Sequence, residues 1–252
     1  MPYRFAWPIL LFALLPAILI AFWPGYFGNL PRSSFAFHAH GLTASAWVLL
    51  VLAQSWTAST RRFASHRWLA RAVLVAVPLF AGGAALAMQS MAVKFVTKSE
   101  PFYAALGARL GLDDVVASVS LVWMVRAAIL ARRRVGLHAA YMLSTVLLVL
   151  SPIIARLPVP HVPHLGELFT AAVALALYAT RPRDGWPFLL VVALATLRAV
   201  QFETVAASAT WARLVGMLAD VPAAALALPA TLAAAAAIWT VWPWQRGAAS
   251  VA

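Results

Sequence analysis

Residues 72–93 read AVLVAVPLFAGGAALAMQSMAV, a stretch of 22 residues with no charged side chain between Arg71 and Lys94. A helix of that length rises about 33 Å, which is enough to cross the hydrocarbon core of a bilayer. A helix that is apolar on every side must be buried in protein or in lipid. The stretch therefore predicts a transmembrane helix.

The rest of the chain has the same character. Of its 252 residues, 64% are hydrophobic and 10% are charged, whereas soluble domains have roughly 45–50% apolar and about 25% charged residues. Too few polar side chains are present to cover a water-facing surface. The chain also has no cysteine, which excludes disulfides, thiolate metal sites and thiol nucleophiles.

Apolar stretches bounded by charge, Pro-Gly or Trp recur along the whole sequence. They predict an all-α fold, a polytopic transmembrane helical bundle of about eight helices that forms a single transmembrane domain over residues 1–252. The first contains Pro8 and Pro16 and lacks a small-x-small cleavage site, so we expect an uncleaved first helix. The predicted helices lie near 6–23, 41–58, 72–93, 115–131, 135–155, 168–180, 186–206 and 221–244.

Basic residues gather in every second loop, as the positive-inside rule requires. They explain the net charge of +12 better than nucleic-acid binding does, so we expect a lipid bilayer and no nucleic acid as partner. The pattern predicts an N-in/C-in protein of a bacterial inner (cytoplasmic) membrane. The cytoplasmic basic residues would be Arg4, Arg61, Arg62, Arg67, Arg71, Arg132, Arg133, Arg134, Arg181, Arg183 and Arg246.

Two segments outside the predicted spans have helical patterns of their own. The longest loop, 94–114, predicts a surface helix over 102–112 on the outer face, and 208–219 predicts another. This loop would place Asp113 and Asp114 outside the hydrocarbon region.

One internal repeat links two of the basic turns. Arg61-Arg62-x-x-x-His66 and Arg133-Arg134-x-x-x-His138 have the same spacing, 72 positions apart. Each lies between two apolar stretches, which indicates two copies of one hairpin in a pseudo-symmetric four-helix core.

Because the chain has no cysteine and few carboxylates, histidine is the main candidate for ligation, and the topology separates an inner pair from an outer cluster. His66 and His138 would begin helices at similar depth, as two axial ligands of a membrane haem b must. Haem propionates need positive groups, and candidates lie nearby. The cofactor-binding candidates are His66, His138, Arg62, Arg67 and Arg134. The alternative is that both turns only contact lipid headgroups and that no cofactor binds.

The outer cluster suits copper or zinc, because imidazole binds both metals and three prolines stiffen one of the two segments. A helical face with seven-residue steps, from His40 through Trp47 to Gln54, would turn His40 toward the bundle. The metal-ligand candidates are His38, His40, His161 and His164. Solvated or hydrogen-bonded histidines are the alternative.

Three polar residues are predicted to be buried inside the bundle: Arg198, Glu203 and Gln54. Arg198 lies deepest in its span, where an unpaired guanidinium costs at least about 2.5 kcal/mol. We therefore expect it to face the interior and to pair with a carboxylate, a helix-end carbonyl or a bound anion. Glu203, or a residue of the helices predicted at 72–93 and 135–155, is the leading candidate partner in the protein.

Several motifs resemble a family of uncharacterised bacterial multi-pass membrane proteins, whose pattern is H-x-H-G, then Trp and Gln on one helix, H-R-x-L-G, and later H-K-R-L-M-L. The resemblance covers about residues 35–215. It implies a multi-pass membrane fold and no established activity. The chain has Ala70 in place of the usual Gly, and Ala139-Ala140-Tyr141 in place of Lys-Arg-Leu. The matching residues are His38-x-His40-Gly41, Trp47, Gln54, His66-Arg67-x-Leu69 and His138-x-x-x-Met142-Leu143.

The arrangement also resembles di-haem b-type cytochromes, which place histidine pairs near opposite faces of a four-helix core; this is an analogy of fold only. Our leading hypothesis is a redox-linked protein that binds haem b or a quinone headgroup near His66 and His138, with a second site near His40. A non-catalytic accessory subunit of a larger membrane complex is the competing hypothesis, and a small-solute transporter with a cavity at Arg198 is the third. Whether the chain is an enzyme stays open, although paired-carboxylate catalysis is disfavoured because adjacent Asp113 and Asp114 diverge on a helix.

Overall fold

The computed structural model describes residues 3–160 and 162–243, and every regular element within these ranges is helical. This confirms the predicted all-α class. A π-helical turn, Leu10–Leu14, joins the first two helices, and a 3-10 segment, Phe27–Arg32, follows them. The α-helices are α1 (Ala6–Ile9), α2 (Leu15–Phe22), α3 (Phe35–Ser59), α4 (Phe63–Ala70), α5 (Val73–Thr97), α6 (Pro101–Leu130), α7 (Val135–Leu147), α8 (Leu150–Ile154), α9 (Leu165–Thr180), α10 (Trp186–Glu203), α11 (Ala209–Leu218) and α12 (Ala223–Trp239).

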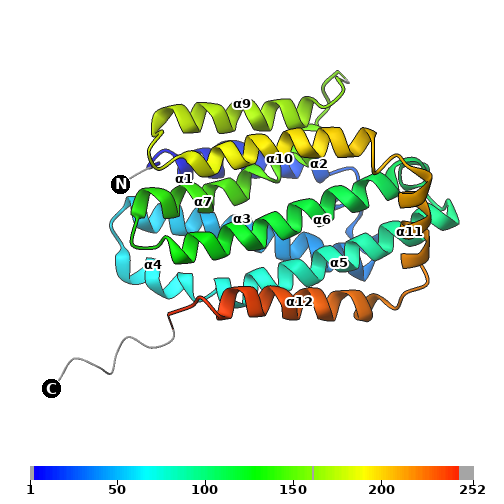
Figure 1. The fold of residues 1–252 in the computed structure, drawn as a ribbon, viewed down its shortest axis with the longest axis horizontal. Coiled ribbons are helices and arrows are strands. Elements are labelled where there is room, and N and C mark those ends of the chain that lie inside the picture. The colour runs from blue at the N-terminus through cyan, green and yellow to red at the C-terminus, as the bar shows by residue number, and fades with distance from the viewer. Residues whose placement is uncertain (1–2, 161, 244–252) are drawn as a thin grey trace.

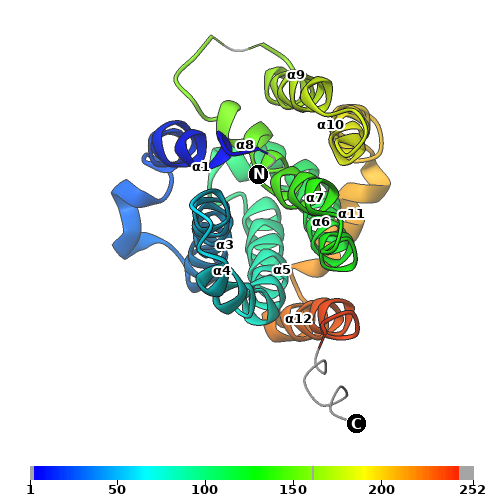
Figure 2. The ribbon, with the colours of Figure 1, turned by 90° about the vertical axis from the view of Figure 1, so that its left-hand side faces the viewer.

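The long helices run side by side along the long axis of the molecule (Figure 1). Seen from one end, α5 lies centrally, and α3, α6 and α12 pack against it (Figure 2). The short helix α4 lies at one end of the bundle, whereas α11 lies across the other end. The first described residues and the end of α12 both lie at the α4 end. The two histidine-bearing turns, before α4 and before α7, therefore share one end of the bundle.

Five helical segments among the described residues are long and apolar enough to cross a membrane, and a sixth counts if α11 and α12, bent by 100°, form one span. The chain thus has the helices of an integral membrane protein. The apolar helix α9 has only 16 residues, and α6 is long but carries several charges. The count of eight spans and the N-in/C-in orientation stay predictions. The five segments are Ala6–Arg32, Phe35–Ser59, Val73–Thr97, Val135–Ile154 and Trp186–Glu203.

Two helices, α6 and α3, begin earlier in the sequence than predicted. The helix α6 is continuous from Pro101, so the separate surface helix over 102–112 is wrong. Its glycines let it continue against α5, since a Cβ on Gly107 would lie 3.1 Å from the Met91 carbonyl oxygen. The helix α3 begins at Phe35, where the Ser34 hydroxyl accepts a hydrogen bond from a backbone N–H of the first turn. His38 and His40 therefore lie inside a helix.

Adjacent glycines let α5 pack closely on two sides. A Cβ on Gly82 would overlap the Thr231 hydroxyl of α12, and one on Gly83 would lie 3.1 Å from the Ala39 carbonyl oxygen of α3. Small residues allow such close approach between membrane helices. The Gly82-Gly83 pair thus fixes the positions of α3 and α12 around α5.

Candidate functional site

The inner histidines are held in the same way at the α4 end of the bundle. His66 Nδ1 lies 3.2 Å from the Gln54 carbonyl oxygen of α3, and His138 Nδ1 lies 2.8 Å from the Ala128 carbonyl oxygen of α6. A carbonyl oxygen can only accept, so both rings carry their proton on Nδ1 when they make these bonds. Neither Nε2 has a hydrogen-bond partner among the described residues. Each ring therefore has a free nitrogen lone pair.

The internal repeat has a structural basis. Arg62 precedes α4 and Arg134 precedes α7, and their carbonyl oxygens accept from the N–H groups of His66 and His138 at 3.0 and 2.9 Å. Each histidine thus ends the first turn of its helix and bonds back to the preceding long helix. The two rings are also near enough to interact electrostatically.

Gln54 lies near the depth of His138 in the bundle. Trp47 Nε1 donates to the Thr145 hydroxyl at 3.2 Å, which sets the level at which α3 meets α7. Because both helices advance about 1.5 Å per residue, Gln54 on α3 and His138 on α7, each seven residues from that contact, reach a similar depth. Gln54 is 7% exposed, and its side-chain oxygen is buried without a partner among the described residues. This oxygen is available to a bound group.

The predicted arginines surround this end on its exposed side. The guanidinium of Arg62 lies 4.6 Å from the ring centre of Trp56. Arg67 and Arg134 are exposed, and no side-chain hydrogen bond or ion pair occupies them within the described chain. Burial lowers the pKa of His66 below 6.5, Arg67 lowers it further, and the bond to the Gln54 carbonyl opposes the shift. The imidazole of His66 is therefore held in its neutral form, the form that can ligate iron.

Two of the outer histidines have separate partners in the described part of the chain, and the predicted metal site stays a prediction. His38 Nδ1 lies 3.1 Å from the Tyr26 hydroxyl, and His164 Nε2 lies 3.3 Å from a carboxylate oxygen of Glu203. His40 Nδ1 is buried without a partner. Over residues 3–160 and 162–243 no group of three or more His, Asp or Glu side chains could hold a metal ion. His161, the fourth candidate, lies outside the described residues.

Arg198 lies inside the bundle and is 3% exposed. Its Nε and Nη2 donate to the two carboxylate oxygens of Asp113 at 2.6 and 2.5 Å, and its Nη1 donates to the Leu148 carbonyl oxygen at 3.0 Å. Pro152, four residues after Leu148, has no N–H to give that carbonyl. The guanidinium supplies the missing donor where α7 ends and α8 begins, so Arg198 joins α6, α7 and α10.

Glu203 is not the partner of Arg198, and the prediction that Glu203 is buried is wrong. Its side chain is 53% exposed and pairs with Arg109 at 3.2 Å and with His164. Glu203 is the last residue of α10. Asp113 was missed as the partner because the sequence placed it in an outer loop. The absence of proline after Pro101 was the signal for a longer helix.

Comparison with known protein families, curated proteins and solved structures gave no match. The resemblance carried by the histidine motifs therefore stays a prediction. The class that the fold itself defines is a polytopic, all-helical integral membrane protein.

Proposed function

We propose that this chain is a redox-linked membrane protein in which His66 and His138 bind one redox group, a b-type haem or a quinone headgroup. The observation that carries the proposal is the shared anchoring of both Nδ1 atoms on backbone carbonyls. Histidines that bind metals nearly always donate their other ring N–H to such an acceptor, which fixes the ring and its tautomer.

The residues at this end suit either group. Both Nε2 atoms would ligate haem iron, or would accept hydrogen bonds from a quinol, and the Gln54 side chain adds a further polar atom. Arg67 and Arg134 would bind haem propionates, because guanidinium groups match carboxylates in charge and shape. When bound, either group supplies electron-transfer chemistry.

Absorption spectroscopy of the full chain, purified after haem-replete expression, tests the haem form. Asparagine is the sharpest replacement, because its amide can keep the Nδ1-type bond to the carbonyl while the Nε2 ligand is lost. We expect His66→Asn and His138→Asn each to remove the same Soret signal, and the double variant to add little. His38→Asn, at the opposite end of the bundle, is the control and should keep the signal.

Binding of a short-chain quinone to the purified protein tests the other form. We expect His66→Asn and His138→Asn each to weaken quinone binding relative to the unsubstituted chain. Haem and quinone are then distinguished by which signal the two asparagine variants remove. A protein with neither signal, or with a signal that survives both substitutions, would refute the proposal and leave the accessory-subunit hypothesis ahead.

A further inference from the structure

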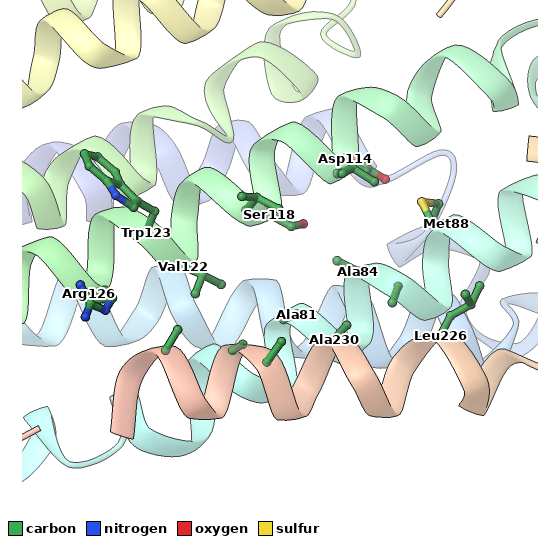
Figure 3. Close-up of a pocket in the computed structure, with 16 residues that line it drawn as sticks. Ala81, Ala84, Met88, Asp114, Ser118, Val122, Trp123, Arg126, Leu226 and Ala230 are labelled. Atoms are coloured by element: carbon green, nitrogen blue, oxygen red, sulfur yellow. The ribbon is translucent and has the colours of Figure 1, made fainter. Parts of the chain in front are cut away.

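We propose that a groove between α5, α6 and α12 binds an elongated cationic amphiphile, whose ammonium group pairs with Asp114 while its apolar chain lies along the alanines of α12. The site is separate from the inner histidines, and the proposal does not depend on the redox function. Figure 3 shows the groove with Asp114 at one end and Arg126 at the other.

The groove has the size of a ligand site. Its volume is about 480 Å³, within the range of about 300–1,000 Å³ that is common for small-molecule sites. The α5 side is lined by small residues and Met88, and the α12 side by Leu226 and a series of alanines that includes Ala230. These two walls can contact an apolar chain along its length, but they contain no partner for a charged group.

The charged side chains of the groove both come from α6. Asp114, Ser118, Val122 and Arg126 follow one another at intervals of four residues, so they form a row that winds by about 120° around α6 while it follows the groove. Asp114 and Arg126 are twelve residues apart, so they lie about 18 Å from each other along the axis. The groove is therefore long, apolar through its middle, and opposite in charge at its two ends.

The charge of Asp114 has no partner in direct contact. Its neighbour Asp113 takes both carboxylate bonds of Arg198, whereas Asp114 makes no side-chain hydrogen bond or ion pair within the described residues. Burial and the neighbouring charge of Asp113 disfavour the charged form of Asp114, and Arg156 and Arg198 oppose them only through longer-range electrostatics. A carboxylate inside an apolar groove is costly unless a partner neutralises it, and a cationic headgroup would supply that partner.

Arg126 sets the direction of the bound molecule. It also makes no side-chain hydrogen bond or ion pair with the described residues, so its positive charge repels an ammonium group from the opposite end of the groove. The headgroup is thereby directed to Asp114 and the chain toward Val122.

Binding of radiolabelled dodecyltrimethylammonium to the full chain in nanodiscs of zwitterionic lipid tests the site. We expect saturable binding that dodecanol, which has the same chain without the charge, does not compete for at equal concentration. Asp114→Asn should weaken binding at least about tenfold, as loss of a desolvated charge pair does. Asp220→Asn, which neutralises an exposed carboxylate before α12, should leave binding unchanged.

A second pair of variants tests the groove without changing a charge. Ala230→Leu fills the α12 wall and should reduce binding, whereas Ala236→Leu, on the exposed side of the same helix and outside the groove lining, should not. Equal binding of dodecanol would indicate a lipid tail and would overturn the proposal. Unchanged binding in both Asp114→Asn and Ala230→Leu would also overturn it.

Discussion

Removal of Arg198 should destabilise this protein far more than removal of any exposed arginine. The Arg198 and Asp113 side chains are only 3% and 15% exposed, and the guanidinium makes three hydrogen bonds to two other helices. Loss of one partner from a buried pair costs about 3–5 kcal/mol, because the other charge stays buried and unpaired. Arg198→Met and Asp113→Leu should each lower the free energy of unfolding by about that amount.

The double variant separates a charge pair from general packing. With both charges removed, only the Leu148 carbonyl loses its donor, a cost of about 1–3 kcal/mol. The double variant should therefore be more stable than either single variant. The assay is reversible unfolding by dodecyl sulfate in mixed micelles, followed by the far-UV circular dichroism of the helices.

The exposed pair of Arg109 and Glu203, whose side chains are 33% and 53% exposed, is the matched control. Arg109→Met should change stability by about 0–1 kcal/mol, as surface pairs do. If Arg198→Met proved as mild as Arg109→Met, or if the double variant lost the sum of the two single losses, the account of a buried and mutually compensating pair would be refuted.

Three further predictions concern packing, pH and topology. Gly82→Leu should destabilise the protein by about 1–3 kcal/mol, because the new side chain meets α12. Gly111→Ala should not, because its Cβ would meet only a side-chain carbon at 3.7 Å. Thermal unfolding in detergent compares the two variants. Since burial lowers the pKa of His66, the unfolded chain binds a proton more readily, so stability should fall as pH drops below about 6.5 and should fall less in His66→Gln. A cysteine placed at Ala64 or Val135, in a chain that has none, should react with an impermeant thiol reagent only from the cytoplasm; labelling from the periplasm would reverse the proposed orientation.

Local sequence signals predicted the helical class and the approximate positions of the long helices. An uninterrupted apolar stretch such as 72–93 has few other folded states open to it in a membrane, and α5 covers it from Val73 onward. The interior position of Arg198 followed from the high energetic cost of exposing a guanidinium to lipid. Both inferences needed only nearby residues and the properties of the bilayer.

The kinds of partner that Arg198 has, a carboxylate and a helix-end carbonyl, were predicted, but the identity of the carboxylate depended on long-range packing and was not. Asp113 precedes the apolar part of α6, so a hydropathy pattern assigns it to a loop. The structure brings it inside because α6 continues over Gly107 and packs on α5, and because Pro152 leaves the Leu148 carbonyl open. Contacts between residues 85 positions apart have no signature in a single sequence.

The two basic turns show which property the repeat preserves. A turn that only contacted lipid headgroups would need arginine and would place no demand on the orientation of an imidazole. In both turns, however, the ring of the histidine is fixed by a backbone carbonyl of the preceding long helix, which costs side-chain entropy.

The Ala128 carbonyl lies in the last turn of α6, where helical carbonyls lack donors, so closing the helix end explains His138. The Gln54 carbonyl lies a turn deeper in α3 and already accepts from the Thr57 hydroxyl at 3.1 Å, so the same explanation does not cover His66. What the two turns share is an oriented imidazole with a free Nε2, and that shared feature favours a ligand between them.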